Sequence, residues 1–395
     1  MMLLLSAVTA ALFLTNYRGM VRYYNTTMLA LSYQYGFTSR SLLGTLYHLL
    51  DAVLPVDLIS YRCVVIVATV CTLAFFAFLL WFCYVCLKKC SMESIRFVEY
   101  LLLLLVIALV STFSFAYNFF RVDLFMIWTV LIAVLCMLKD QSAWIAVPLS
   151  AVGVMFHQGF VLMYFNLILV FLFYLIFTRR DHKKKYTVLF LLSFGIGSAL
   201  FLWFELFSRS NGAAVYDRIA AEAEKLSWHG IYHEPLLYHE VLGIDISDSE
   251  TMFYHMNHVQ LFLFVLCTLP FLVYGISFFV RLIRRGEGVQ NKLKYLAVAV
   301  GAATILPDLL LKVDYGRWML SVCVYYLGIL LILFLMHDPA AEQIALSDMA
   351  RFQTKPWLFA LLLIPVLLVP FLDVDIDSFT QSLQCWFQNN QLLFY

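Results

Sequence analysis

Long apolar stretches recur along the whole chain, and they constrain its fold more than any other feature. About 20 mostly apolar residues are needed for a helix to cross a bilayer. The candidate stretches are Met1–Leu14, Tyr61–Leu87, Phe97–Ala116, Val122–Leu138, Trp144–Phe177, Tyr186–Phe207, Val259–Val280, Lys294–Leu311, Trp318–Met336 and Pro356–Leu372. Only 13% of the residues are charged, against about 25% in soluble domains. A soluble globular fold is therefore excluded.

Charged residues between these stretches predict which loops face the cytoplasm. Cytoplasmic loops of membrane proteins carry an excess of Lys and Arg. Four segments have this excess, namely Lys88-Lys89, Arg179–Lys185, Arg281–Lys292, and Arg351 with Lys355. We therefore expect all four to lie on the cytoplasmic side.

One apolar stretch, Trp144–Phe177, lies between two segments that are both expected inside. Lys139-Asp140 is separated by two spans from Lys88-Lys89, and Arg179–Lys185 is inside by its charge. A single crossing cannot join two ends on the same side. The stretch has 34 residues, which is enough for two short or tilted helices. The sequence therefore predicts a helical hairpin over 144–177, with the polar pair His157-Gln158 at its tip.

The same count of crossings predicts the fold class. Ten apolar stretches, one of them double, indicate an all-α polytopic membrane protein with about 10–11 transmembrane helices. We expect a single domain over residues 1–395, with the N-terminus inside and the C-terminus outside. The outer face then carries two long loops, 15–60 with amphipathic interfacial helices and 208–258, and the tail 373–395.

Composition also excludes several partners and cofactors. A net charge of +1 provides no basic field for nucleic acid. The C-x2-C-x3-C segment at 83–90 has no matched second pair at zinc spacing. Gly230 and Pro235 interrupt any helix that would align the histidines at 229, 233 and 239. We therefore expect no metal and no other cofactor.

Polar residues gather at the outward ends of the predicted helices. The three groups are Asn118–Asp123, Phe156–Gly159, and Asp308 with Lys312–Trp318. Taken singly, such charges are typical of ion pairs and caps at a membrane boundary. Their convergence on one face favours a functional site, because charges at membrane depth are costly. An Arg fork binds phosphate oxygens, and a neighbouring His or Asp can accept a proton.

Part of this pattern resembles a known family. The segment Asn118-Phe119-Phe120-Arg121, then Lys139, then Phe156-His157-Gln158-Gly159 is similar to the signature of the bacterial Wzy/EpsG-type polysaccharide polymerases. In that family an Asn-x-x-Arg at the outer end of one helix precedes a Phe-His pair, and here 36 residues separate Arg121 from His157. The resemblance extends over 118–164. It departs at Val122, where the family commonly has Gln, and after His157, where the family has small residues.

The resemblance implies a polytopic enzyme of the bacterial cytoplasmic (inner) membrane. Such an enzyme joins oligosaccharide repeat units carried on polyprenyl pyrophosphate at the outer face, in the synthesis of exopolysaccharide, capsule or O-antigen. The implied partners are the lipid-linked saccharide and the lipid bilayer. Participation of a chain-length regulator stays open, as do the sugar, the linkage and the oligomeric state.

Such a reaction needs fixed cations for the departing pyrophosphate and a base for the attacking sugar hydroxyl. The expected base is His157, with Asp123 or Asp314 as the alternatives. The expected substrate-binding residues are Arg121, Arg317, Arg40, Gln158, Asn118 and Trp318.

Other functions compete with polymerisation. Another multi-span glycosyltransferase acting on lipid-linked sugars needs the same outer cluster. A transporter or flippase for the same lipid places charges and broken helices near the midplane, often with internal repeats. Mid-span charges are few and no repeat is found, which disfavours a transporter. A membrane acyltransferase needs a His-x4-Asp pair, which the sequence around His157 does not supply.

Overall fold

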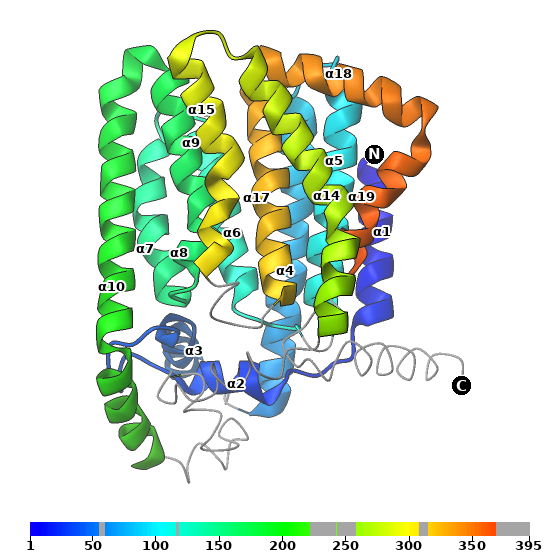
Figure 1. Cartoon of the computed structure of the whole chain (residues 1–395). Coiled ribbons are helices and arrows are strands. Elements are labelled where there is room, and N and C mark those ends of the chain that lie inside the picture. The colour runs from blue at the N-terminus through cyan, green and yellow to red at the C-terminus, as the bar shows by residue number, and fades with distance from the viewer. Residues whose placement is uncertain (55–59, 116–117, 222–241, 243–257, 308–314, 369–395) are drawn as a thin grey trace, which may run out of the picture.

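The computed structural model describes residues 1–54, 60–115, 118–221, 242, 258–307 and 315–368. Within these ranges the chain is a bundle of helices without strands (Figure 1). Asp314, the histidines at 229, 233 and 239, and the tail 373–395 lie outside the described residues. The expected all-helical class is confirmed for the part of the chain that the structure describes.

The described elements follow one another as a series of helices. The first half contains α1 (Met2–Asn16), α2 (Tyr23–Ala30), α3 (Ser41–Val53), α4 (Tyr61–Lys89), α5 (Ile95–Ser114), α6 (Asp123–Met137), η1 (Ala143–Ile145), α7 (Ala146–Phe156), α8 (Phe160–Met163) and α9 (Phe165–Thr178). The second half contains η2 (Arg180–His182), α10 (Lys183–Ala221), α14 (His258–Arg285), α15 (Gly288–Val300), η3 (Gly301–Ile305), α17 (Tyr315–Leu335), α18 (Pro339–Thr354) and α19 (Pro356–Leu368).

Several of these helices have the length and composition of membrane spans. Four are long and apolar enough to cross a bilayer, namely Tyr61–Lys89, Ile95–Ser114, Arg180–Phe207 and Gly316–Leu335. The pair α18 and α19, which meet at a bend of 103°, is a further candidate. These features support a multi-pass membrane protein. The full number of crossings and the orientation of the termini stay predictions.

Burial separates the central helices of the bundle from the outer ones. In the most apolar 18-residue segment of α5, 78% of the residues are buried inside the protein, and in that of α17 the share is 89%. The corresponding shares are 33% in α4 and 22% in the span at 180–207. Large apolar side chains such as Leu202, Trp203 and Leu206 are exposed on α10. Since lipid is the solvent for such a surface, α5 and α17 form the core and α4 and α10 face lipid.

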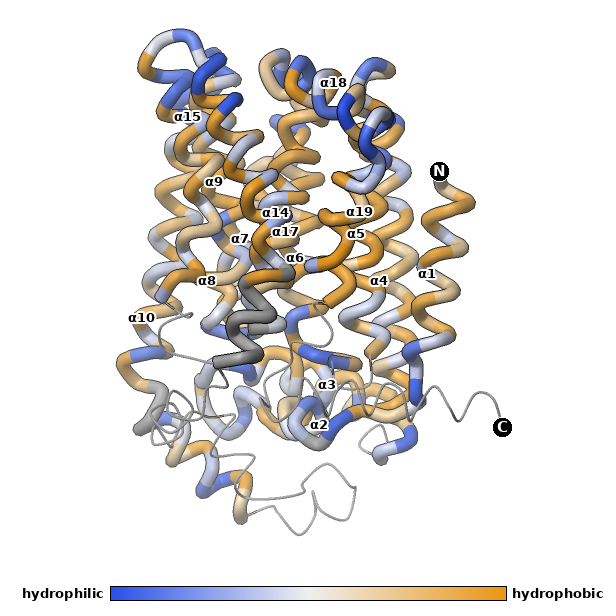
Figure 2. The backbone as a smooth tube through the Cα atoms, turned by 45° about the vertical axis from the view of Figure 1, so that its right-hand side comes forward, coloured by the Kyte–Doolittle hydropathy of each residue, from blue (hydrophilic) through white to orange (hydrophobic). Residues whose placement is uncertain are grey.

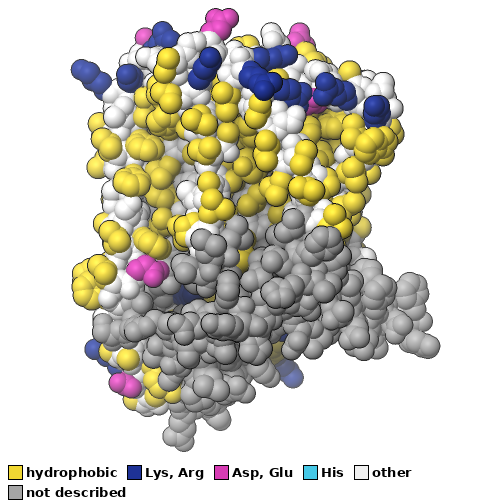
Figure 3. All heavy atoms as spheres, viewed as in Figure 1, with side chains coloured by type: hydrophobic (Ala, Val, Ile, Leu, Met, Phe, Trp, Pro, Cys, Tyr) yellow, Lys and Arg dark blue, Asp and Glu magenta, His cyan; other side chains and the backbone are white. Residues whose placement is uncertain are grey.

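The two ends of the bundle differ in composition. α2 and α3 lie across one end, which we call the α3 end, whereas α18 lies across the opposite end, the α18 end (Figure 1). Hydrophobic residues occupy the middle of the helices, and hydrophilic residues gather toward both ends (Figure 2). On the face shown in Figure 3, Lys and Arg side chains cluster at the α18 end.

The apolar stretch at 144–177 is divided into two helical arms. α7 ends at Phe156, and His157 then takes an extended backbone conformation with φ −166° and ψ 130°. The short α8 follows, and α9 begins at Phe165. α7 and α9 run in opposite directions, so the turn containing His157 lies at the α3 end (Figure 1).

α10 is longer than the sequence analysis predicts. The expected span ends at Phe207 and an outer loop is expected from residue 208, but α10 continues as one helix of 39 residues to Ala221. Its last turns pack on the loop that precedes α3. Arg218 Nη1 donates a hydrogen bond to the carbonyl oxygen of Tyr35 at 2.7 Å. A Cβ atom on Gly36 would lie 2.7 Å from Val215 Cγ2, so this close approach requires glycine.

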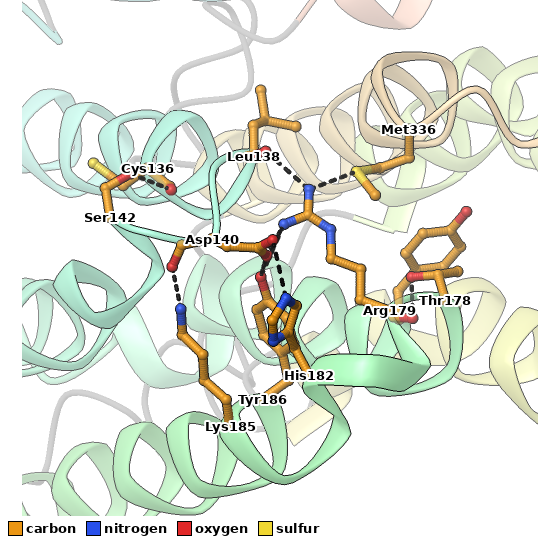
Figure 4. Close-up of polar contacts among 11 residues, drawn as sticks. Cys136, Leu138, Asp140, Ser142, Thr178, Arg179, His182, Lys185, Tyr186 and Met336 are labelled. Atoms are coloured by element: carbon orange, nitrogen blue, oxygen red, sulfur yellow. Dashed lines mark hydrogen bonds and ion pairs between the residues drawn. The ribbon is translucent and has the colours of Figure 1, made fainter.

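At the α18 end, Asp140 joins the turn after α6 to the beginning of α10 (Figure 4). Its carboxylate accepts hydrogen bonds from Arg179 and Tyr186, and its carbonyl oxygen accepts one from Lys185. Arg179 Nη2 also donates to the carbonyl oxygen of Leu138 at 2.9 Å. The hydrogen bond from Tyr186 lowers the pKa of Asp140, and Arg179 acts in the same direction. The carboxylate is therefore charged at neutral pH and fastens the two segments.

Two buried carboxylates hold α18 on the bundle. Asp338 caps the N-terminus of α18, and it accepts a hydrogen bond from Tyr174 at 2.8 Å while Lys294 Nζ lies 3.4 Å away. Asp348, in the middle of α18, accepts two hydrogen bonds from Arg281 at 2.6 and 2.7 Å. Both carboxylates are therefore paired with cations from other helices, as burial of a charge requires.

Candidate functional site

Asp123 is a buried carboxylate at the α3 end of the bundle. It begins α6, where the positive end of the helix dipole favours a negative charge. Its side chain has no solvent exposure that would hydrate the charge. Tyr164 donates its hydroxyl proton to Oδ1 at 3.1 Å, and Arg317 Nε lies 2.9 Å from both carboxylate oxygens. Arg121 Nε lies 3.5 Å from Oδ2.

Two arginines contact the same carboxylate in this cluster. Arg121 and Arg317 are both cationic and both face the single carboxylate of Asp123. Their side chains are 11% and 13% exposed, so water screens them weakly. A guanidinium fork is suited to carboxylate or phosphate oxygens. The cluster therefore presents two side chains of the kind that bind phosphate.

The segment before α6 forms a tight turn that presents Arg121. The side chain of Asn118 accepts a hydrogen bond from Arg121 Nη1 at 2.9 Å, and its carbonyl oxygen accepts one from the Arg121 amide at 3.1 Å. Phe120 has a φ of 63°, in the left-handed region that bulky residues avoid. Such a conformation costs of order 1–3 kcal/mol and persists only where neighbours hold it. Asn25 of α2 provides one such contact, because its Nδ2 donates to the carbonyl oxygen of Phe119 at 2.9 Å.

A small cavity adjoins the cluster. It is lined by Thr112, Phe113, Asn118, Arg121, Asp123, Gly316, Arg317 and Leu320. Its volume of about 10 Å³ is about the space of one water molecule. A sugar or a pyrophosphate is far larger, so this cavity alone holds neither.

His157 lies at the tip of the hairpin and is buried, with 3% of its surface exposed. Its Nδ1 accepts a hydrogen bond from the backbone N–H of Gly159 at 2.9 Å. A neutral imidazole has one acceptor nitrogen, so in this conformation the turn uses the nitrogen that a general base needs. A Cβ atom on Gly159 would lie 2.9 Å from this same Nδ1, which ties the glycine to the turn. The described contacts are thus those of a residue that caps α7.

Gln158 connects the hairpin tip to the loop before α3. Its side-chain oxygen accepts a hydrogen bond from the hydroxyl of Ser39, and its backbone N–H donates to Ser39 Oγ at 3.2 Å. Arg40, which follows, is buried and has a φ of 70° at the N-cap of α3. Its Nη1 donates to the hydroxyl of Tyr24 at 3.4 Å. α2 therefore contacts two parts of the predicted site. Tyr24 lies beside Arg40, and Asn25 lies beside the turn at 118–121.

The structure thus joins some of the predicted site residues directly and others indirectly. Asn118, Arg121, Asp123 and Arg317 form one cluster around the cavity. The hairpin tip lies beside this cluster through ring stacking of Phe156 on Phe125, with centroids 5.5 Å apart. Trp318 is buried and does not line the cavity. Asp314 lies outside the described residues, so its predicted role as a base is not addressed.

Tyr164 is the cluster member that sequence reasoning missed. It is 41 positions from Asp123, in the short link between α8 and α9, and nothing in its local sequence distinguishes it from other aromatic residues of the span. The one indication in the sequence is that the segment resembling the polymerase family, 118–164, ends at this residue. Its hydroxyl supplies a hydrogen bond that a buried carboxylate needs.

Comparisons with family models, curated proteins and solved structures place this chain beside no known protein. No family model matches it, and neither a curated protein nor a solved structure is significantly similar to it.

Proposed function

We propose that this protein polymerises oligosaccharide repeat units carried on polyprenyl pyrophosphate, at the outer face of the bacterial cytoplasmic membrane. The observation that carries the proposal is the sharing of one buried carboxylate, Asp123, by Arg121 and Arg317. Two neighbouring guanidinium groups suit a pyrophosphate, and the position at one end of the bundle suits a substrate whose lipid tail stays in the bilayer.

In the proposed reaction, a hydroxyl of one repeat unit attacks the anomeric carbon of the sugar on the lipid pyrophosphate. A glycosidic C–O bond forms, the bond between that carbon and the phosphate oxygen breaks, and the lipid pyrophosphate leaves with the electron pair. Arg121 and Arg317 stabilise the charge that develops on the leaving group. The hydroxyl proton goes to a base, and Asp123 is our first candidate because the acceptor nitrogen of His157 already serves the turn.

In this scheme the substrate phosphate replaces the Asp123 carboxylate as the partner of the two arginines. The phosphate oxygens take the guanidinium groups that Asp123 contacts in the described conformation, and the carboxylate becomes available to the attacking hydroxyl. Since the cavity has room for about one water, the exchange in this scheme also widens the site. The buried pair with Asp123 is then a resting state of the arginines.

The purified protein in liposomes containing a polyprenyl-pyrophosphate-linked oligosaccharide tests this function. We expect a ladder of polymer and released polyprenyl pyrophosphate in step with each bond formed. Arg121→Lys should lose the ladder, because an ammonium does not reproduce the planar fork. Arg284→Lys, at the exposed C-terminal end of α14 near the opposite face, is the matched control and should retain it. A full ladder with Arg121→Lys contradicts the proposal.

A transporter for the same lipid is the second candidate, and one observation favours it. α15 changes to the 3-10 helix η3 at Gly301, and the side chain of Asn166 donates a hydrogen bond to the carbonyl oxygen of Gly301 at 2.9 Å. Interrupted spans with polar partners are common at transport sites. The same liposomes decide between the two, because a transporter moves the lipid-linked oligosaccharide between leaflets and produces no new glycosidic bond.

A further inference from the structure

A second cavity lies on the other side of the bundle, away from the arginine cluster. It is enclosed by α5, α14, α17, α18 and α19, with Phe97, Phe271, Phe352 and Phe359 among its lining residues. Its volume is about 30 Å³, about two or three times the space of one water. On the α14 side it is lined by Phe271, Tyr274, Gly275 and Phe279, and a Cβ atom added to Gly275 would meet no atom within 4 Å. The wall is therefore thinnest at Gly275, where no side chain stands and the space is open.

The lining of this cavity is unsuited to water. Its residues are aromatic and aliphatic side chains and one glycine. The hydroxyl of Tyr274 donates to Asp348 at 2.9 Å, and that of Tyr326 donates to the carbonyl oxygen of Ala299 at 3.1 Å. Of the three lining tyrosines, Tyr274 and Tyr326 thus have their hydroxyl groups engaged outside the cavity, and Tyr100 packs edge-on against Phe359. A buried water needs two to four polar partners, whereas a hydrocarbon chain needs none.

Two exposed basic residues, Arg351 and Lys355, lie near the part of the cavity that is closest to the α18 end. Phe352 lines the cavity and directly follows Arg351, an exposed residue of the last turn of α18. Lys355, also exposed, lies at the 103° bend between α18 and α19, one turn before Phe359. Arg351 is close enough to Tyr274 to interact with it electrostatically. Asp348 in the same region is already paired with Arg281. An anion is therefore the complement of this surface.

We propose that the cleft between α14 and α19 binds an anionic phospholipid of the surrounding bilayer. Its acyl chain enters the aromatic cavity beside Gly275, and its phosphate lies against Arg351 and Lys355. Basic residues at the membrane surface next to a gap between spans are the usual elements of such lipid sites. This site is independent of the proposed function, because it shares no residue with the arginine cluster.

The first arm of the test compares headgroups. The purified protein is mixed with phosphatidylglycerol or with phosphatidylcholine of the same acyl chains in detergent micelles, and bound lipid is counted by native mass spectrometry. We expect retention of phosphatidylglycerol over phosphatidylcholine. Replacing Arg351 or Lys355 by Gln should each reduce the preference about fivefold, the effect of one cation near a lipid headgroup. Both residues are exposed, so the variants keep the fold.

The second arm fills the cleft without a clash. Gly275→Leu places its side chain where no atom lies within 4 Å, and leucine favours a helix more than glycine does. It should abolish retention of phosphatidylglycerol while the protein stays folded. Gly195→Leu is the matched control, because Gly195 of α10 also has nothing within 4 Å and lies far from the cleft in sequence and on another helix. It should retain lipid as the unmodified protein does.

Three results overturn the proposal. They are equal retention of the two phospholipids, undiminished retention by Gly275→Leu, and co-purification of a polyprenyl phosphate in place of phospholipid. If Gly275→Leu fails to fold, the exposed Gln variants still decide, because loss of headgroup preference supports the site and an unchanged preference refutes it.

Discussion

Arg317 Nε is equidistant from the two carboxylate oxygens of Asp123, at 2.9 Å, although 194 positions separate the residues. The pair joins the beginning of α17 to the beginning of α6. It therefore fastens the core helix of the bundle to the helix that carries the Asn-x-x-Arg turn. Because Arg121 faces the same carboxylate, any change at Asp123 acts on two cations at once.

Removing the carboxylate should destabilise the protein strongly. Asp123→Asn removes the buried carboxylate that Arg121 and Arg317 both contact, and breaking a buried pair costs about 3–5 kcal/mol. Thermal unfolding in detergent measures the loss. Adding Arg317→Gln to Asp123→Asn should recover a large part of it, because the second change removes a cation that has lost its contact with the carboxylate. Strictly additive losses in this double-mutant cycle would mean that the pair is not coupled.

Arg121 should matter for activity more than for stability. Arg121→Lys keeps the positive charge near Asp123 but loses the fork that holds both Asn118 and a phosphate. We expect the protein to be produced at a normal level and to make little polymer in a cell-based or liposome assay. The equivalent change at Arg317 should cost stability as well, because Arg317 makes the shorter contact with Asp123. Normal polymer from Arg121→Lys would reduce Arg121 to a boundary anchor.

Two substitutions of His157 separate turn capping from catalysis. Asn can place its oxygen near the position of Nδ1 and accept the Gly159 N–H, whereas Gln cannot reach that position in the same way. If His157 only caps α7, His157→Asn should retain stability and polymer, and His157→Gln should lose stability. If it is also the base, His157→Asn should keep its stability but lose about 10²–10⁴-fold in rate. Polymer length and thermal unfolding are measured together.

The Asp140 contact predicts a pH dependence at the α18 end. The hydrogen bond from Tyr186 lowers the pKa of Asp140 from its ordinary 3.8, with Arg179 adding to the effect. The unfolded chain therefore binds the proton more readily, so the stabilisation is fully present above pH 3.8 and is lost as the pH falls through the lower folded pKa. Unfolding of the protein and of Asp140→Asn should differ at pH 6 and converge in strong acid. A constant difference across that range would exclude this linkage.

Topology can be tested independently of any enzyme activity. A cysteine at Gln158 and another at Lys184 should be labelled from opposite sides of the membrane by an impermeant reagent. The prediction follows from the two arms α7 and α9, which place these positions at opposite ends of the bundle (Figure 1). Labelling of both from the cytoplasm would contradict the hairpin in the membrane.

Apolar length and helix ends made part of the site predictable. Asn118, Arg121, Asp123 and Arg317 all lie where apolar stretches begin or end, so counting spans already places them on one face. The shared face is compatible with a contact between Asp123 and Arg317, which are 194 positions apart. The sequence does not predict that contact, because spacing along the chain does not show which helices are neighbours. Tyr164 was invisible for the same reason.

Local backbone geometry was less predictable. The left-handed conformations of Phe120 and Arg40 have no sequence signal, since neither residue favours positive φ. The use of His157 Nδ1 by the Gly159 amide was equally hidden, although it changes the reading of that histidine from base to cap. The continuation of α10 through 208–221 is not evident from hydropathy, because polar residues interrupt the apolar stretch after Phe207, but Val215 and Ile219 are buried against the protein.

The buried carboxylates of α18 imply that the two ends of the protein are joined differently. Asp338 and Asp348 are each paired with a cation and with tyrosine hydroxyls from other helices, so these buried carboxylates join α18 to several neighbours. Asp123 instead contacts two arginines. Contacts among separate helices therefore hold the α18 end at two points along α18, whereas at the α3 end Arg121 and Arg317 meet at one carboxylate.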